Sequence, residues 1–457
     1  MENTSKMYTY IILITSFGLI ASCIIFNISL VYGFLGAIIF SIIMLRKLGF
    51  ALKELTNMMI KGIIEYKIIF IIVVLMGTTI SIWLSSGTVP ALIYYGFKYI
   101  QDTNYLLACF FITSIISVVM GTGLGTLSTM GIALLAIGKG LSIPSHILLG
   151  TMISGAFLAD KISPISGLVN LNLKVTGVKY NQGIKSMMKT LVPVFILSSI
   201  IYYFIGENYT SQINPLEISK YQQNIMYSFS ISPMLLILPV GVIVMSIFGV
   251  KTVPNMSIGI MVGSLISIFY QNISVENLIK YVLMGFKIQD NPQLSEILKG
   301  GGVFPMTEVI LIVMGALALN GLFDGTNIIA PIIDGIIKNI KSRGSLIART
   351  GLLSMLLTTA TCDQTVGIVV PGKFLKNKYK ELNLDNGVLT RTISDTGVVI
   401  APLEPWNVNS ILIAVITGIS TTEYAPYAVL CYLFPIITIA TGYLNIRLSK
   451  VRSTKQI

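Results

Sequence analysis

Charged side chains are scarce in this sequence: Asp, Glu, Lys and Arg make up 11% of its 457 residues, against 54% hydrophobic residues. Together with a mean hydropathy of +0.82, this scarcity excludes an ordinary soluble protein. Apolar runs that suggest membrane spans recur along the whole chain. They lie near residues 8–26, 28–45, 68–86, 104–120, 145–159, 190–206, 231–249, 256–271, 303–323, 345–360, 408–421 and 425–446.

Several of these runs are shorter than the roughly 20 apolar residues that a straight helix needs to cross the hydrocarbon core. We therefore predict a single all-α polytopic membrane domain over residues 1–457. We expect about ten to thirteen transmembrane segments, some of them broken or re-entrant.

Histidine and cysteine are also rare, at one and four residues. We interpret His146 as an interfacial hydrogen-bonding residue, because a lone His at the start of a span is a poor proton relay. Cys23, Cys109, Cys362 and Cys431 are too scattered for a disulfide framework or a zinc site. The chain also lacks a His cluster, a nucleophile elbow and a nucleotide-binding loop. These absences predict that it is not an enzyme, and we expect no cofactor.

Acidic residues are outnumbered by basic ones, 19 against 31, which gives a net charge of +12. The basic residues cluster between spans, where Lys and Arg mark cytoplasmic loops, so the charge does not indicate nucleic-acid binding. We place both termini in the cytoplasm of a cell with the protein in its cytoplasmic membrane, and segments 87–103 and 207–230 outside. The clusters are Arg46 to Lys67, Lys174 to Lys189, Lys338 to Arg349, Lys373 to Lys380, and Arg447 to Lys455.

A carboxylate inside one apolar run is the most informative feature present. The segment Gly155–Ser166 contains Asp160, a neighbouring cation, two serines and Pro164. A charge at the centre of a helix in the bilayer costs about 2.5–3.5 kcal/mol on insertion scales, so it indicates a functional site. Pro164 lacks an N–H and disfavours a helical Ser163. The helix should break there and leave carbonyl and hydroxyl oxygens beside the acid.

The interruptions come in two pairs, one pair in each half of the chain. In the first half, Gly121–Thr129 precedes the Asp160 segment, and in the second half, Thr358–Thr365 precedes the segment that runs from Asp395 to Trp406. Small residues also serve close helix packing, but packing explains neither the hydroxyls nor carboxylates at corresponding offsets. Matching interrupted segments in two halves indicate a transporter site built on internal repeats.

Na+ requires hard oxygen ligands, which carboxylates, hydroxyls and freed carbonyls supply. Burial disfavours an ionised carboxylate, so a buried Asp can hold a proton or a cation but not both. This is the minimum requirement for a cation–proton exchanger.

Short motifs that carry a family resemblance run through nearly the whole chain. They are Trp83, Ser86–Gly96, Gly121-Thr122, Gly125-Thr126, Gly131–Leu134, Gly155–Ser166, Asn170-Leu171, Gly300–Gly302, Asp363-Gln364, Pro371-Gly372, Arg391-Thr392, Asp395–Gly397 and Pro405–Asn407. In this order and at these separations, the chain resembles the NhaC family of sodium–proton antiporters. The resemblance implies two inverted-topology repeats, here 28–206 and 231–447, with a midplane site between them and alternating access.

The leading hypothesis is therefore a Na+/H+ antiporter with Na+ and H+ as its partners, and a small organic anion is left open as a further partner. Asp160, Asp363 and Asp395 are the expected carboxylate ligands of the transported metal ion. Glu404 is the expected accessory proton carrier. The neutral residues expected at the ion or substrate site are Ser163, Ser166, Thr122, Thr126, Gln364, Thr396 and Asn407.

Two charged positions depart from the family pattern. Gly167 stands where the family usually has an acid, and Glu404 stands where it is usually apolar. Glu404 could therefore replace the missing acid at a shared site, or the cargo could differ.

Two other functions remain as alternatives. One is an organic-acid or amino-acid exchanger of the malate/lactate type, in which helix N-termini and the backbone N–H groups of Gly121–Gly125 would bind a carboxylate. The other is an ion channel, which the asymmetric breaks disfavour because channels are usually built from symmetric subunits. The lipid bilayer is the expected surrounding, and a homodimer is left open.

Overall fold

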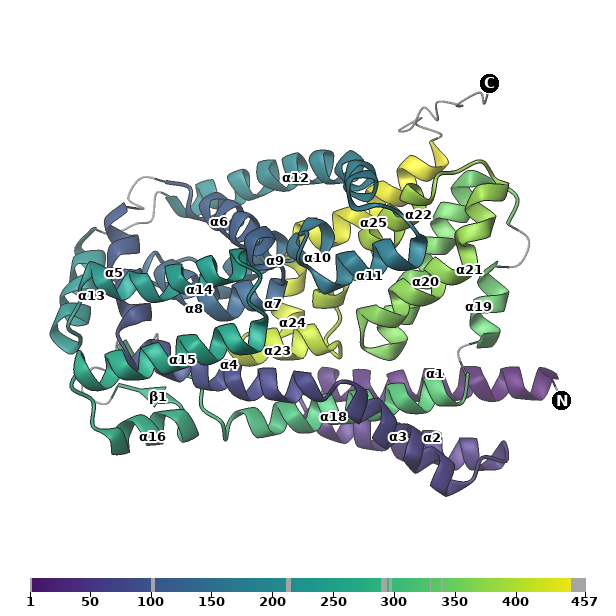
Figure 1. Cartoon of the computed structure of the whole chain (residues 1–457), viewed down its shortest axis with the longest axis horizontal. Coiled ribbons are helices and arrows are strands. Elements are labelled where there is room, and N and C mark those ends of the chain that lie inside the picture. Colours follow the sequence, from purple (N-terminus) through teal and green to yellow (C-terminus); the bar gives the residue numbers. More distant parts are fainter. Residues whose placement is uncertain are drawn as a thin grey trace.

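The computed structural model describes residues 2–99, 103–210, 215–288, 294–295, 298–328, 330–337 and 340–444. This part of the chain is a bundle of helices with one very short hairpin, formed by β1 (Phe286–Lys287) and β2 (Lys299–Gly300) (Figure 1). The basic residues after 444 that were predicted to be cytoplasmic lie outside the described residues.

Each apolar run predicted from the sequence corresponds to a helix. Among the described residues, seven helices are long and apolar enough to cross a membrane, and the number reaches ten if each of three bent pairs is one span. The predicted class, an all-α multi-pass membrane protein with broken segments, is confirmed. The corresponding helices are α1 (Glu2–Ile25), α2 (Leu30–Lys47), α4 (Lys67–Ser85), α6 (Tyr105–Met120), α9 (Ser145–Ala156), α12 (Tyr180–Thr210), α14 (Ile237–Ile247), α15 (Thr252–Phe269), α18 (Met306–Gly325), α20 (Arg343–Thr361), α23 (Val408–Thr417) and α25 (Val429–Tyr443).

The remaining helices were not predicted, because they are short, glycine-rich or polar on one face. They include a π-helix at Leu127–Gly131, a second π-helix at Ser394–Val398 and short 3-10 turns at Pro233–Leu236, Ala401–Leu403 and Ala425–Tyr427. The others are α3 (Leu52–Glu65), α5 (Thr88–Tyr99), α7 (Gly123–Thr126), α8 (Ile132–Gly140), α10 (Ala159–Ile162), α11 (Gly167–Thr176), α13 (Pro215–Ser228), α16 (Val275–Met284), α19 (Ala330–Ile337), α21 (Gln364–Glu381), α22 (Asn386–Ile393) and α24 (Thr421–Tyr424).

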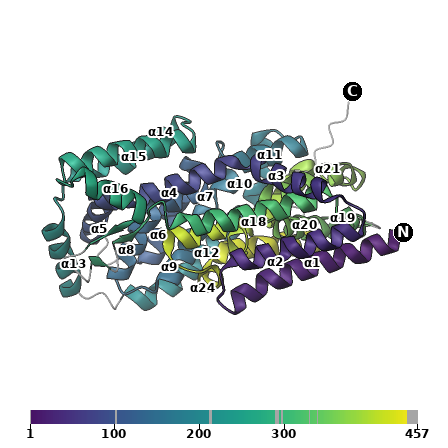
Figure 2. The same ribbon diagram turned by 90° about the horizontal axis from the view of Figure 1, so that it is seen from below.

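Helix α18 is the support on which the N-terminal helices pack. Figure 2 shows α1 and α2 side by side along one edge of the bundle, and α2 also contacts α18. Helix α3 crosses α18 at Gly62 and Gly321, where a Cβ on Gly62 would lie 2.6 Å from the Leu317 carbonyl oxygen. Small residues of this kind let helix backbones approach closely inside membranes.

The first pair of breaks has the same backbone conformation in both halves. Helix α6 ends at Gly121 (φ 76°, ψ 3°) and helix α20 ends at Cys362 (φ 57°, ψ 13°). The next residue is extended in both cases: Thr122 (φ −146°, ψ 136°) begins α7, and Asp363 (φ −143°, ψ 141°) begins α21. At each break, a left-handed residue followed by an extended residue ends one helix and begins the next.

The second pair of breaks also matches. Extended Ser163 and Ser166 flank Pro164 between α10 and α11, and extended Glu404 and Asn407 flank Pro405 before α23. The sequence has carboxylates at corresponding offsets in the two halves, but Asp160 and Asp395 do not occupy corresponding places in the structure. Asp160 lies in the turn just before Ser163, whereas Asp395 lies further back, in a π-helix that is separated from Glu404 by a 3-10 turn.

The matched positions Gly121 and Cys362 should respond differently to substitution. We expect Gly121→Ala to lower stability by roughly 1–2 kcal/mol, because the left-handed conformation disfavours a Cβ. In addition, that Cβ would lie 2.5 Å from Cγ1 of Ile165. Cys362→Gly should be nearly neutral, since relief of the same backbone strain offsets the loss of a buried thiol. Thermal unfolding of the purified variants measures both effects. If the two variants lost equal stability, the inference that both positions have the same left-handed conformation would be wrong.

Candidate functional site

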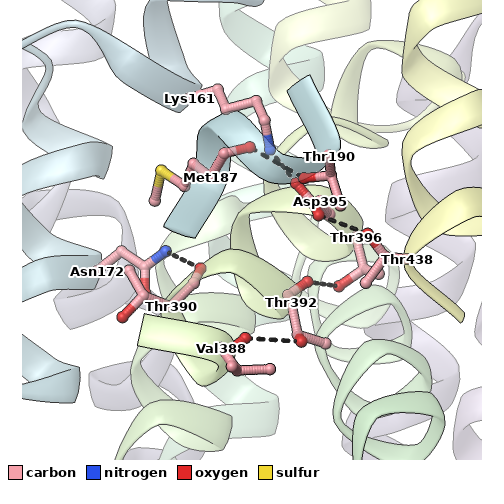
Figure 3. Close-up of polar contacts among 10 residues, drawn as sticks. All are labelled: Lys161, Asn172, Met187, Thr190, Val388, Thr390, Thr392, Asp395, Thr396 and Thr438. Atoms are coloured by element: carbon pink, nitrogen blue, oxygen red, sulfur yellow. Dashed lines mark hydrogen bonds and ion pairs between the residues drawn. The ribbon is translucent and has the colours of Figure 1, made fainter. Parts of the chain in front are cut away.

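The short helix α10 lies between the two halves and contributes a charged residue to the contact. Lys161 donates to one carboxylate oxygen of Asp395 in the second π-helix, and both side chains are fully buried (Figure 3). Thr438 of α25 donates to the other oxygen of Asp395. The Lys161 ammonium also lies 4.0 Å from the centre of the Phe434 ring. Residues 234 positions apart in the sequence therefore form one ion pair between two broken segments.

A buried ion pair of this kind is poor evidence for stability, because desolvation of the two charges can exceed their attraction. An apolar pair of similar volume would fill the same space at lower cost. Inside a membrane, paired ionisable residues commonly mark ion or substrate pathways. The pair of Lys161 and Asp395 is thus the strongest candidate for the functional centre.

Asp160, the neighbour of Lys161, faces the first half of the chain. Its carboxylate accepts a hydrogen bond from the Ser166 hydroxyl, 3.3 Å away, and lies near the backbone N–H of Gly123 at the start of α7. The side chain is 8% exposed. The chain's own carboxylate therefore occupies the helix N-terminus at which the organic-acid hypothesis would place a substrate carboxylate.

Asp363 begins helix α21 and is partly buried. Its carboxylate accepts from the Thr365 backbone N–H and from the Tyr66 hydroxyl, both at 3.1 Å. Gln364 donates to the Val398 carbonyl oxygen, 2.7 Å away. The segment that includes the second π-helix is thereby attached to the break at Asp363.

Glu404 is buried rather than a solvated loop acid, at 6% exposed. It accepts hydrogen bonds from the Thr359 hydroxyl and from the Asn407 amide, the latter at 3.1 Å. Trp406 donates from Nε1 to the Thr359 carbonyl oxygen at 3.2 Å. These contacts join the two breaks of the second half to each other, and they do not include Gly167, whose surroundings are open.

The other predicted hydroxyl ligands bond to nearby backbone. Thr126 donates to the Thr122 carbonyl oxygen, and Thr396 donates to that of Thr392 (Figure 3). Ser163 donates to the Val118 carbonyl oxygen on α6 at 2.6 Å. Their oxygen lone pairs remain available in principle to accept a cation, so their roles stay predictions.

The three predicted aspartates do not form one cluster. Within the described ranges, no three Asp, Glu, His or Cys side chains come close enough together to hold a metal ion. Asp160, Asp363 and Asp395 each have separate partners. Sequence reasoning noted a cation beside Asp160 but did not assign Lys161 to the site, and it missed Thr438 and Tyr66 because each lies in or beside an ordinary apolar run.

A cavity of about 1060 Å³ lies next to the second half of the site, and none of Asp160, Lys161, Asp363, Asp395 and Glu404 lines it. Its walls come from the turn between α1 and α2, helix α8, strands β1 and β2, the start of α18 and helices α23 and α24. Pro405, which follows Glu404, lines the cavity, and Lys139 and Glu308 are among its charged lining residues. The cavity thus leads to the break at Glu404.

Paired broken helices and a buried ion pair between two halves define a secondary transporter rather than an enzyme. Comparison with known proteins agrees. The model of the Na+/H+ antiporter family matches residues 155–446. The chain is 31% identical to the Na+/H+ antiporter NhaC of Alkalihalophilus pseudofirmus, over 89% of this chain and 88% of the relative. The chain therefore belongs to the Na+/H+ antiporter family.

Two further relatives are of similar closeness. The Na+/H+ antiporter NhaC of Bacillus subtilis is 29% identical over 87% of this chain and 88% of its own length. The malate-2H+/Na+-lactate antiporter of the same organism is 30% identical over 87% of this chain and 85% of its own length.

Proposed function

We propose that the chain exchanges Na+ for H+ across the cell membrane and that Asp395 is its central carboxylate. The observation that carries this proposal is the buried pair of Lys161 and Asp395, which joins the two broken segments. In this conformation the proton-bearing ammonium of Lys161 occupies one oxygen of Asp395. A Na+ ion that reaches Asp395 has to displace that ammonium, because one carboxylate does not neutralise both.

The displaced ammonium of Lys161 then releases its proton, which leaves a neutral amine beside Na+-bound Asp395, and Lys161 takes up a proton again when Na+ leaves. This mutually exclusive occupancy couples the two ions. Thr438 and Thr396 lie beside Asp395, and their hydroxyl oxygens are neutral ligands of the kind that Na+ binds (Figure 3). Asp160 and Glu404 are the further buried acids, on the first-half and second-half sides respectively, and Glu404 stays the proposed accessory proton carrier. Asp363, Gln364 and Asn407 position the breaks through their hydrogen bonds.

We infer that 28–206 and 231–447 are inverted repeats that rock around this pair. The matching turns at Gly121 and Cys362, and at Pro164 and Pro405, support the repeat relationship. The clusters of Lys and Arg between spans support cytoplasmic termini. Lys161 comes from the first repeat and Asp395 from the second, so movement of one repeat against the other would separate them.

Na+-driven proton movement in reconstituted vesicles tests this function. Vesicles that hold the purified chain and a pH-sensitive dye should change internal pH when Na+ is added outside, with no organic acid present. An empty-vesicle control measures leakage. A requirement for malate, lactate or an amino acid in the same assay would contradict simple Na+/H+ exchange and favour an organic-acid or amino-acid exchanger.

A further inference from the structure

Arg391 is a buried cation to which the mechanism above gives no role. It lies on α22, is 4% exposed, and its Nε has no hydrogen-bond partner. None of the ion pairs found in the described part of the chain includes it. An unpaired buried charge costs several kcal/mol, and such an unsatisfied group in a folded protein requires an explanation.

The position of Arg391 in the sequence supplies one. Arg391 precedes Asp395 by one helical turn, the i, i+4 spacing at which Arg and Asp side chains pair on an α-helix. A π-helix begins at Ser394, so the helix geometry changes at Asp395 itself. Asp395 instead meets Lys161 and Thr438, which come from other helices.

Two cations therefore lie within reach of one carboxylate: Lys161, which is paired with it, and Arg391, which precedes it by one helical turn. The positive charge of Arg391 disfavours the Lys161 ammonium. Among the described residues, no ion pair joins Asp160 to either cation. The local charges thus allow two ion pairs, Lys161 with Asp395 and Arg391 with Asp395, and this conformation contains the first.

We propose that Asp395 alternates between two partners, Lys161 of the first half and Arg391 of its own helix. This inference rests on the proposed exchange function. When Lys161 withdraws and before a cation arrives, Arg391 takes over the carboxylate. Arg391 is a positioning residue: a guanidinium keeps its proton in proteins, so it neutralises Asp395 without carrying a proton across the membrane.

A double-mutant cycle on thermal stability of the full-length purified chain tests the alternation. Lys161→Met alone should lower the midpoint only slightly, because Arg391 replaces the lost partner. Arg391→Met alone should leave it unchanged or raise it. The double variant should lose roughly 5–10 °C more than the sum of the single losses, because Asp395 is then buried without any cation. Adding Asp395→Asn to the double variant should restore most of that loss.

Two matched controls separate the ion pair from general packing. Arg391→Lys keeps the charge and should remove the excess loss when combined with Lys161→Met. Arg349→Met on α20, where the guanidinium bonds to the Ile336 carbonyl oxygen, should be additive with Lys161→Met. Additive losses for Lys161→Met with Arg391→Met would overturn the proposal, as would a loss from Arg391→Met equal to that from Lys161→Met.

The transport assay on the same preparations keeps the two proposals apart. If the losses of thermal midpoint are non-additive but the protein shows no Na+-driven proton flux, the alternation of Asp395 between two partners stands and the assigned cargo is wrong. An additive cycle in a protein with normal flux would overturn the alternation alone. Arg391→Met is expected to lower the maximal rate of exchange more than it changes the Na+ concentration for half-maximal rate, because it acts on the transition and does not touch the ion.

Discussion

Replacement of Asp395 by Asn should abolish Na+-driven proton flux and also destabilise the protein. Asn has the shape of Asp but no charge, so it cannot hold Na+ in exchange for an ammonium. It also leaves the buried ammonium of Lys161 unpaired, and loss of one partner of a buried pair costs about 3–5 kcal/mol. Flux in vesicles and the thermal midpoint measure the two effects.

A second substitution separates the two effects of Asp395→Asn. Asp395→Asn combined with Lys161→Gln removes both charges, so the thermal midpoint should recover while flux stays absent. Asp385→Asn is the matched control, since Asp385 is an exposed N-cap of the same helix α22 and Asn caps helices as well as Asp. Flux in the Asp395→Asn variant similar to that of the unaltered protein would refute the central role of Asp395.

Asp160→Asn should also abolish exchange, but with the opposite effect on stability. Asp160 has no cationic partner among the described residues: its carboxylate accepts from the Ser166 hydroxyl and lies near the Gly123 N–H. The amide oxygen of Asn can accept from both groups, and removal of an unpaired buried charge costs nothing in desolvation. We therefore expect unchanged or higher thermal stability with flux reduced to the level of empty vesicles.

Asp324→Asn, at the exposed end of α18, is the control for Asp160→Asn and should affect neither flux nor stability. If Asp160→Asn retains full flux at saturating Na+, Asp160 serves only to cap α7. If it instead unfolds like Asp395→Asn, the assignment of its partners is wrong.

The spans were predictable because a bilayer demands long apolar runs, and the breaks because Gly, Pro and hydroxyl residues stand out within such runs. The π-helix at Ser394–Val398 was not predictable from these signals. This π-helix and the 3-10 turn at Ala401–Leu403 lie between Asp395 and the break at Glu404, whereas Asp160 stands directly before the break at Ser163. Asp160 and Asp395 are therefore not equivalent.

The partners of the acids could not be predicted either. The sequence shows that Lys161 and Asp395 are each out of place in apolar surroundings, but it carries no signal that they meet. The pairing depends on the packing of α10 against the second π-helix. Tyr66, which bonds to Asp363, stands at the junction of α3 and α4 and has no distinguishing neighbours in the sequence. Long-range contacts of this kind follow from the fold alone.

The separation of 234 residues between Lys161 and Asp395 has a consequence for biogenesis. At about 5–20 residues per second, the ribosome needs roughly 10–50 s to make the intervening chain. Throughout that time, Asp395 has not yet been synthesised, and Lys161 remains without it at the insertion machinery or at the membrane surface. The segment 145–176 should therefore settle into the bilayer only after the second half has been synthesised, and a chain truncated before Asp395 should leave this segment accessible to proteases.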